Sequence, residues 1–159
     1  MQPNLTNLTG ASRFTRSISS PSRVLVVDDD DAVRRFVKRA LDGNGYVVDA
    51  TATGADALTR IHDGQTYDLI VADVHMPEMS GPQLVARVRQ TGSQAKVLYV
   101  TGFADQLFDE RDAHLWADEA FLDKPCTVQG LREAVSLLLH GQIDDSPLGK
   151  TPDSAGRDE

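Results

Sequence analysis

Four short runs of wholly apolar residues limit what this 159-residue chain can fold into more than any other feature. Each run has only three or four residues, too few for a helix, and β-branched residues are frequent in the first three. An apolar run without polar alternation predicts a strand covered on both faces, as in a parallel sheet. The runs lie at residues 24–27, 69–72, 97–100 and 120–122, and a more mixed run at 46–50 fits an edge strand.

Helical patterns separate the apolar runs. Apolar residues within 33–41 and 131–139 recur at the spacing of one face of an α-helix, and shorter stripes of this kind occur at 57–61 and 84–88. A weaker pattern, rich in charge, lies at 105–115. Regular alternation of strand and helix predicts an α/β fold with a parallel sheet, right-handed crossovers and helices on both faces. In such folds, ligands bind beyond the carboxyl ends of the strands.

Charge and composition exclude several classes of protein. The chain has 16 basic and 24 acidic residues, a net charge of −8, which argues against binding held mainly by nucleic acid or anionic lipid. The single cysteine, Cys126, excludes an intrachain disulfide. No apolar run approaches the roughly 20 residues of a membrane span, and the first 22 residues lack a secretory signal. We therefore expect a soluble, cytoplasmic protein.

The composition also predicts the domain organisation. Residues 1–22 are rich in Ser, Thr and Asn without periodicity, and we expect them to form a flexible tail. Residues 141–159 carry aspartates, prolines and glycines, and we expect a second, acidic flexible tail. The patterned residues 23–140 then form a single domain.

Polar side chains that can do chemistry follow the apolar runs, where the predicted strands end. Aspartates occupy residues 28–31, Asp73 and Thr101 each follow a run, and Lys124 comes two residues after the last run. Carboxylates held together need a cation or a raised pKa, and Mg²⁺ binds through one or two carboxylates. A lysine and a hydroxyl beside such an ion form a site for a phosphoryl group, and an aspartate can be its nucleophile.

Each of these residues has a simpler interpretation when it is taken alone. An aspartate run is typical of a helix N-terminus, a threonine of a turn, and a lysine of a solvated surface. The combination favours a site, because all the residues follow predicted parallel strands. The remaining candidates are weaker: the histidines lack metal-ligand spacing, and packing or surface roles are favoured for His62, His75, His114, His140, Cys126 and Trp116.

These motifs resemble, in order and spacing, the receiver domain of two-component response regulators. The resemblance covers residues 23–140 and implies a flavodoxin-like, doubly wound, five-stranded parallel sheet of order 2-1-3-4-5 with five helices. The matching segments are Val24-Leu25-Val26-Val27-Asp28-Asp29, Asp73 with Met76-Pro77 and Ser80-Gly81, Val100-Thr101-Gly102, and Phe121-Leu122-Asp123-Lys124-Pro125.

The resemblance also implies a role for each site residue. Asp73 would accept the phosphoryl group, and Lys124 and Thr101 would bind its oxygens. Mg²⁺ would be held by Asp28, Asp29 and Asp73 and by the backbone carbonyl of His75, with Asp28 acting through water. Thr101 and Phe121 would form the switch, and the Lys124–Pro125 bond would be cis.

Partners and output follow from the same resemblance. A sensor histidine kinase or a phosphotransfer protein would supply the phosphoryl group, and a downstream protein would read the change in contacts. The only catalysis would be self-phosphorylation and self-dephosphorylation. We expect no direct binding to nucleic acid or membrane, and a homodimer is possible.

Three other interpretations compete with a phospho-accepting receiver. A pseudo-receiver would keep the fold as an interaction module without phosphorylation, and a receiver could also be a piece of a hybrid histidine kinase. A Mg²⁺-dependent phosphatase would use an aspartyl-phosphate too, but it would carry a second acid two residues after the nucleophile. That position holds His75.

Overall fold

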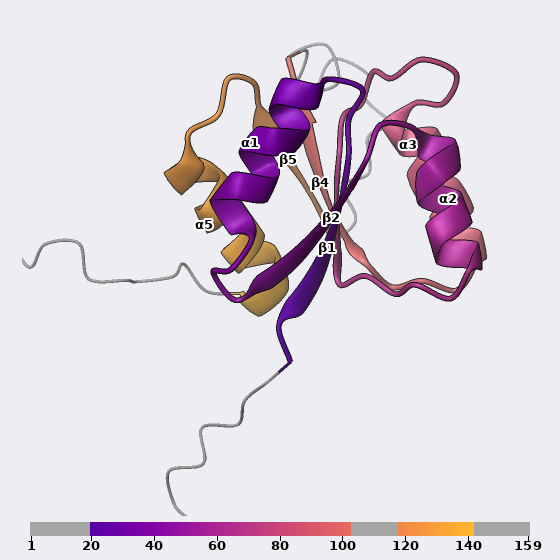
Figure 1. Ribbon diagram of the computed structural model, residues 1–159, viewed down its shortest axis with the longest axis horizontal. Coiled ribbons are helices and arrows are strands. Elements are labelled where there is room, and N and C mark those ends of the chain that lie inside the picture. Colours follow the sequence, from indigo (N-terminus) through magenta and orange to yellow (C-terminus); the bar gives the residue numbers. More distant parts are fainter. Residues whose placement is uncertain (1–19, 103–117, 142–159) are drawn as a thin grey trace, which may run out of the picture.

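The computed structural model describes residues 20–102 and 118–141, in which strands and helices alternate (Figure 1). Every helix in this part of the chain is too short or too polar to cross a lipid bilayer. The elements are, in order, β1 (Ser22–Val27), α1 (Asp31–Leu41), β2 (Tyr46–Thr51), α2 (Gly54–His62), β3 (Leu69–Ala72), α3 (Gly81–Gln90), β4 (Lys96–Thr101), β5 (Glu119–Asp123) and α5 (Val128–His140).

The strands form one parallel sheet of order β2-β1-β3-β4-β5, as predicted. The mixed run at residues 46–50 belongs to β2, which lies at the edge of this sheet as expected. The helix expected around residues 105–115 lies outside the described residues. All five strands run in one direction, so their carboxyl ends meet at one edge of the sheet, the upper edge in Figure 1.

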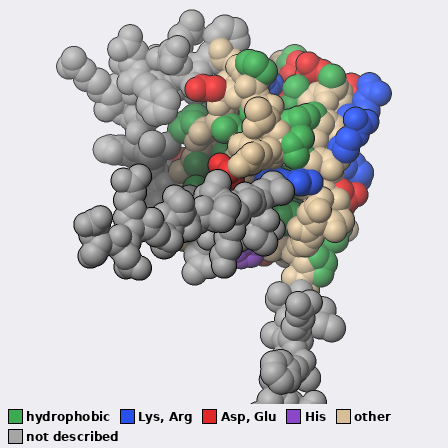
Figure 2. Space-filling view, turned by 90° about the vertical axis from the view of Figure 1, so that its left-hand side faces the viewer, with side chains coloured by type: hydrophobic (Ala, Val, Ile, Leu, Met, Phe, Trp, Pro, Cys, Tyr) green, Lys and Arg blue, Asp and Glu red, His purple; other side chains and the backbone are tan. Residues whose placement is uncertain are grey.

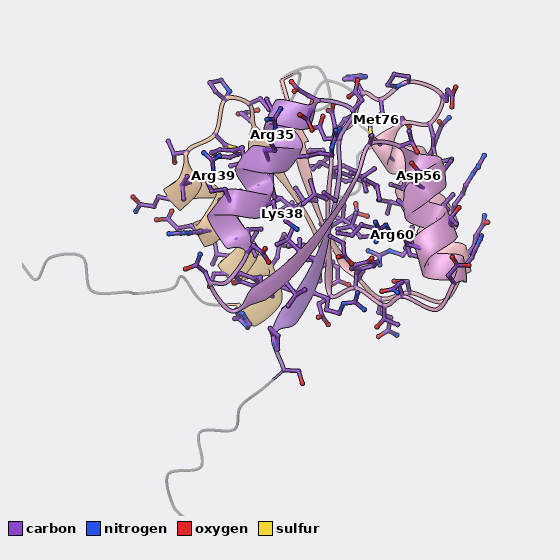
Figure 3. The ribbon with its side chains drawn as sticks, viewed as in Figure 1. Arg35, Lys38, Arg39, Asp56, Arg60 and Met76 are labelled. Carbon is purple, nitrogen blue, oxygen red and sulfur yellow. The ribbon has the colours of Figure 1, made fainter. Side chains whose placement is uncertain are left out.

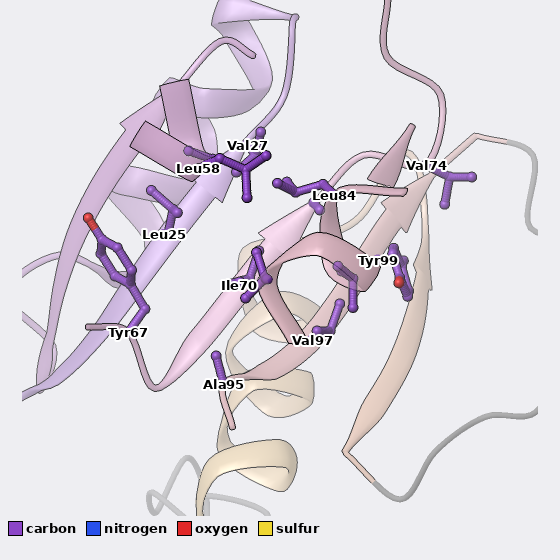
Figure 4. Close-up of a cluster of buried hydrophobic side chains, with 14 residues drawn as sticks. Leu25, Val27, Leu58, Tyr67, Ile70, Val74, Leu84, Ala95, Val97 and Tyr99 are labelled. Carbon is purple, nitrogen blue, oxygen red and sulfur yellow. The ribbon is translucent and has the colours of Figure 1, made fainter. Parts of the chain in front are cut away.

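Helices cover both faces of the sheet, with α1 and α5 on one face and α2 and α3 on the other (Figure 1). Each apolar strand alternately sends side chains to two separate cores. Leu25 and Val27 enter the core beneath α2 and α3, which Figure 4 shows, and Val24 and Val26 enter the core beneath α1 and α5. Burial on both faces explains why these strands are wholly apolar.

Hydroxyl and carboxylate caps fix where the helices begin. At the start of each described helix, a side-chain oxygen accepts a hydrogen bond from a backbone N–H group in the first turn. Helix α3 has a full capping box, in which Ser80 and Gln83 each accept from the backbone N–H group of the other. The capping residues are Asp30, Thr53, Ser80 and Thr127.

Gly81 allows α3 to pass close to the end of β3. A Cβ atom at this position would lie 2.4 Å from the carbonyl oxygen of Asp73 and 3.2 Å from the Cα atom of Val74. The backbone N–H group of Gly81 donates to the carbonyl oxygen of Val74 at 2.9 Å. A residue with a side chain could not make this approach unless α3 or the segment that carries Asp73 moved.

Candidate functional site

Three aspartates from two strand ends gather at the carboxyl edge of the sheet. Asp28 and Asp29 follow β1, and Asp73 follows β3, the neighbouring strand. One carboxylate oxygen of each lies within 4.8 Å of the others. Asp28 is 2% exposed and Asp73 is 9% exposed, whereas Asp29 is open to solvent. Two buried carboxylates beside a third create a demand for positive charge.

Lys124, in the turn after β5, brings a positive charge to this cluster. Its Nζ atom lies 2.9 Å from Oδ2 of Asp28 and 3.5 Å from Oδ2 of Asp73. Burial lowers the pKa of the Lys124 ammonium, but its hydrogen bonds and charge interactions with Asp28 and Asp73 outweigh burial and raise that pKa. The lysine is therefore a fixed cation at neutral pH.

Asp28 is held by several groups in addition to Lys124. Its Oδ1 atom accepts from the backbone N–H of Asp30 at 2.8 Å, and its carbonyl oxygen accepts from Nη1 of Arg34 at 2.6 Å. Burial raises the pKa of the Asp28 carboxyl, although the hydrogen bonds from Asp30 and Lys124 lower it in part. The position of this side chain is thus fixed by the loop that leads into α1.

Asp73 is fixed by the backbone on both sides of it. Its N–H group donates to the carbonyl oxygen of Val27 at 3.0 Å, which ties it to the end of β1. Its Oδ1 atom accepts from the N–H group of His75 at 3.3 Å. The carboxylate therefore faces Asp28 and Lys124 from a rigid strand end.

Thr101 and Phe121 lie on the adjacent strands β4 and β5. Thr101 ends β4 and is fully buried, and its carbonyl oxygen accepts from the N–H group of Lys124 at 2.9 Å. The half-buried ring of Phe121 stacks on Tyr99 with a centroid separation of 5.0 Å. A backbone hydrogen bond thus joins Thr101 to Lys124. In the sheet Thr101 pairs with Asp123 of β5, and Phe121 lies two residues before Asp123 on the same strand.

Two of the weaker candidates lie at helix ends. His62 and His140 end α2 and α5, which lie on opposite faces of the sheet (Figure 1). Cys126 is partly buried, and burial raises the pKa of its thiol. The Lys124–Pro125 bond is cis, as the resemblance implied. His114 and Trp116 lie outside the described residues.

Arg34 is a site residue that the sequence interpretation missed. It donates to the Asp28 carbonyl oxygen, and its Nη2 atom lies 3.0 Å from Oδ1 of Asp31. The spacing of Asp31 and Arg34, three residues apart in a helix, was the available signal, since such residues are neighbours on a helix surface.

A doubly wound parallel sheet with carboxylates, a buried hydroxyl and a lysine at its carboxyl edge defines a phosphoryl-transfer class of α/β domain. A family model described as response regulator receiver domain matches residues 24–136. The chain therefore belongs to the response regulator receiver family, which confirms the resemblance.

Curated relatives of two kinds agree with this membership. Sensor kinase CckA of Brucella abortus is 38% identical over 126 residues, which are 79% of this chain and 13% of that protein. Response regulator MprA of Mycolicibacterium vanbaalenii is 36% identical over 132 residues, 82% of this chain and 56% of that protein. The chain thus spans about half of one relative and a small part of the other. Response regulator receiver protein CpdR of Brucella abortus is 32% identical over 117 residues, which are 74% of this chain and 96% of that protein.

Solved receiver structures share the fold. The receiver domain of hybrid histidine kinase CckA superposes with a TM-score of 0.60 at 32% identity, over 74% of this chain and 98% of that one. The response regulator TrrA of Thermotoga maritima, solved in complex with Mg²⁺ and BeF, has a TM-score of 0.63 at 33% identity, over 74% of this chain and 99% of that one.

Proposed function

We propose that this receiver accepts a phosphoryl group on Asp73. The observation that carries the proposal is the shared contact of Lys124, whose ammonium lies between the carboxylates of Asp28 and Asp73. A cation in this position neutralises charge on a group bonded to Asp73. A pseudo-receiver would not need these carboxylates, hydroxyl and lysine together, so the arrangement favours phosphoryl acceptance over that alternative.

The donor set fits a hard divalent cation, and we propose Mg²⁺. The carboxylates of Asp28, Asp29 and Asp73 offer oxygen ligands within 4.8 Å of one another, and Mg²⁺ takes oxygen ligands directly or through the waters that it keeps. We also assign the backbone carbonyl of His75 to this site. When bound, the ion would neutralise charge on the phosphoryl oxygens. The complex of TrrA with Mg²⁺ and BeF supports this assignment by homology.

The phosphoryl step uses the side chains at the end of β3 and after β5. An oxygen of the Asp73 carboxylate attacks phosphorus in line with the bond to the donor, a P–N bond when the donor is a phosphohistidine. That bond breaks, and its electron pair stays on the donor nitrogen. Lys124 then pairs with a phosphoryl oxygen, in exchange for part of its contact with Asp28 and Asp73.

A change at Thr101 and Phe121 would carry the signal away from Asp73. The Thr101 hydroxyl would turn toward a phosphoryl oxygen, and Phe121 would leave its stack on Tyr99 to fill the space. The change shifts a balance between two states. About 5.5 kcal/mol is needed to reverse a 1:99 balance, and two or three charge-assisted bonds of about 1.5–3 kcal/mol each approach it.

We propose that the phosphoryl donor docks on the groove between α1 and α5. Helix α1 carries four basic residues and one acidic residue, in a chain of net charge −8. Figure 3 shows Arg35 and Arg39 along α1, and Figure 2, which faces this side, shows basic side chains beside hydrophobic ones. A groove of about 610 Å³ is lined by Ala32, Arg35, Phe36, Arg39, Ala40, Val128 and Arg132. A donor protein with acidic and apolar residues complements it.

The wider context of the chain is also a proposal. The relatives show the same domain within a sensor kinase and covering nearly all of a receiver protein, so either setting is compatible with the site. We propose a cytoplasmic protein whose only catalysis is self-phosphorylation and self-dephosphorylation. Flexible tails at residues 1–22 and 141–159, a downstream protein target and a homodimer remain predictions.

Incubation with Mg²⁺ and a small phosphodonor, followed by intact mass measurement, tests the phosphoryl acceptor. The wild-type chain should gain one phosphoryl group, and Asp73→Asn should gain none. Asp56→Asn, on the exposed surface of α2, is the matched control and should behave like the wild type. Uptake of label by Asp73→Asn at the wild-type rate would remove the assignment.

The docking groove is tested with a phosphorylated histidine phosphotransfer protein that labels the wild-type chain. Arg35→Glu and Arg39→Glu should slow this transfer about tenfold or more, while labelling by the small phosphodonor stays unchanged. Arg87→Glu, an exposed charge on α3, is the control. Equal slowing by the Arg87 and Arg39 variants would place docking elsewhere.

A further inference from the structure

The outer edge of β2 carries backbone groups at the place where a further strand would pair. β2 is an edge strand, and its only partner in the described sheet is β1. The Thr51 carbonyl oxygen accepts from Asp28 on the β1 side, so the groups of Thr51, Asp49 and Val47 face β1. Those of Tyr46, Val48 and Ala50 face outward, because hydrogen-bonding direction alternates along a strand.

The end of α1 occupies these outward groups. The N–H group of Val48 donates to Oδ1 of Asp42 at 3.3 Å, and its carbonyl oxygen accepts from Nζ of Lys38 at 3.0 Å. The carbonyl oxygen of Tyr46 accepts from the N–H group of Gly43 at 3.2 Å. Both hydrogen-bonding groups of the central outward residue are therefore taken by side chains of another element.

The side chains of Lys38 and Asp42 together cover the outer edge of β2 at Val48. Lys38 lies in the last turn of α1 and Asp42 is its C-cap residue, four positions later, and their Nζ and Oδ2 atoms are 3.9 Å apart. Their side chains are 52% and 44% exposed, so the pair stands on the solvent side of the edge, where an incoming strand would lie. Charged side chains at a sheet edge disfavour pairing with another chain, because pairing would bury them.

The strand beneath this cover is suited to pairing. β2 has the sequence Tyr-Val-Val-Asp-Ala-Thr, rich in residues that favour strands, and Val47 is 43% exposed. Two copies of one edge can meet about a two-fold axis, which makes an antiparallel pair of identical strands. We propose that Lys38 and Asp42 close the β2 edge against pairing with β2 of a second copy of this chain.

The test compares the ion pair at the end of α1 with an ion pair at its start. Lys38→Ala/Asp42→Ala removes the cover, and Asp31→Ala/Arg35→Ala removes a pair at the same spacing whose side chains form their ion pairs within α1. Sedimentation over a range of concentrations should show self-association of the first variant beyond that of the wild type, and none beyond the wild type for the second. Exchange of the Val48 amide in dilute, monomeric samples should be about 2- to 10-fold faster in the first variant.

Two further variants connect the association with β2. Asp42→Asn keeps an oxygen for the Val48 amide and should preserve most of its protection. Val47→Lys, added to Lys38→Ala/Asp42→Ala, should restore the association state of the wild type, because it places a charge on the pairing strand. Circular dichroism confirms that each variant is folded.

Several results would overturn the proposal. One is a folded Lys38→Ala/Asp42→Ala variant that associates no more than the wild type, whatever the exchange rate of Val48. Equal association of the two double variants would show that the effect is not specific to the edge. Association that persists with Val47→Lys would place the contact on another surface.

Discussion

Replacement of Gly81 by alanine is a direct test of how α3 positions Asp73. The new Cβ atom would lie 2.4 Å from the carbonyl oxygen of Asp73, and real Cβ contacts essentially never fall below 3.0 Å. The contact must therefore open by at least about 0.6 Å, through movement of the backbone at Asp73, of the start of α3, or of both. Overpacking of this kind costs about 1–3 kcal/mol, which exceeds the roughly 0.5–1 kcal/mol that alanine gains over glycine in a helix.

Gly54 offers a matched control. It is also the first residue of a helix, and it is also buried. A Cβ atom there would lie 2.7 Å from the Sδ atom of Met79, but a thioether at the end of a flexible side chain can move away. Gly54→Ala should therefore change the free energy of unfolding by less than about 1 kcal/mol.

Thermal unfolding and phosphoryl uptake measure the two consequences. The net cost of about 1 kcal/mol should lower the melting temperature of Gly81→Ala by about 2–8 °C relative to the wild type, given about 2–8 °C per kcal/mol for domains of this size range. Displacement of Asp73 should also slow uptake from a small phosphodonor about tenfold or more, since small misplacements of a reacting group are costly. A Gly81→Ala protein as stable and as reactive as Gly54→Ala would refute the argument from backbone contact.

Three further changes test other parts of the structure. Burial raises the pKa of Glu119 above its ordinary value of 4.5, so its ionised form opposes folding. Glu119→Gln should unfold at higher denaturant concentration than the wild type at pH 7, and the advantage should disappear as the pH falls through the raised pKa toward 4.5. Tyr67→Phe removes a 2.8 Å hydrogen bond to Asp49 and should cost about 0.5–1.5 kcal/mol in urea unfolding. Lys124→Met leaves Asp73 without its ammonium partner and should slow phosphoryl uptake by about 10²-fold or more in a mass time course, whereas Lys96→Met should leave the rate unchanged.

The sequence predicted the sheet well because burial on both faces leaves a strong signal. The apolar runs became β1, β3, β4 and β5, and the mixed run became the edge strand. Strand ends were less certain, since Thr101 belongs to β4 and not to the loop after it. A terminal residue of a strand has no periodicity of its own to mark it.

The aspartate run shows where sequence reasoning stops. Both interpretations of this run, a metal site and a helix cap, hold for different residues of it. Asp28 and Asp29 lie beside Asp73 in the carboxylate cluster. Asp30 caps α1, and Asp31 pairs with arginines. Four identical residues cannot reveal this division, because it depends on which way each side chain turns at the end of β1.

The cover on the edge of β2 was also not predictable from the pattern. In the sequence, the spacing of Lys38 and Asp42 indicates only an ordinary ion pair on the surface of a helix. Their contacts with Val48 depend on the angle at which α1 crosses the sheet, which periodicity does not encode.

The two-core arrangement has a consequence for how the protein is made. Leu131, Val135 and Leu138 of α5 complete the core on the α1 face, and Arg132 donates to the carbonyl oxygen of Ala40 at the end of α1. A ribosome synthesises every strand of the sheet before α5, so the part of the core on the α1 face that α5 completes stays open until α5 leaves the exit tunnel. During that interval we expect chaperones that bind apolar surface to recognise the growing chain.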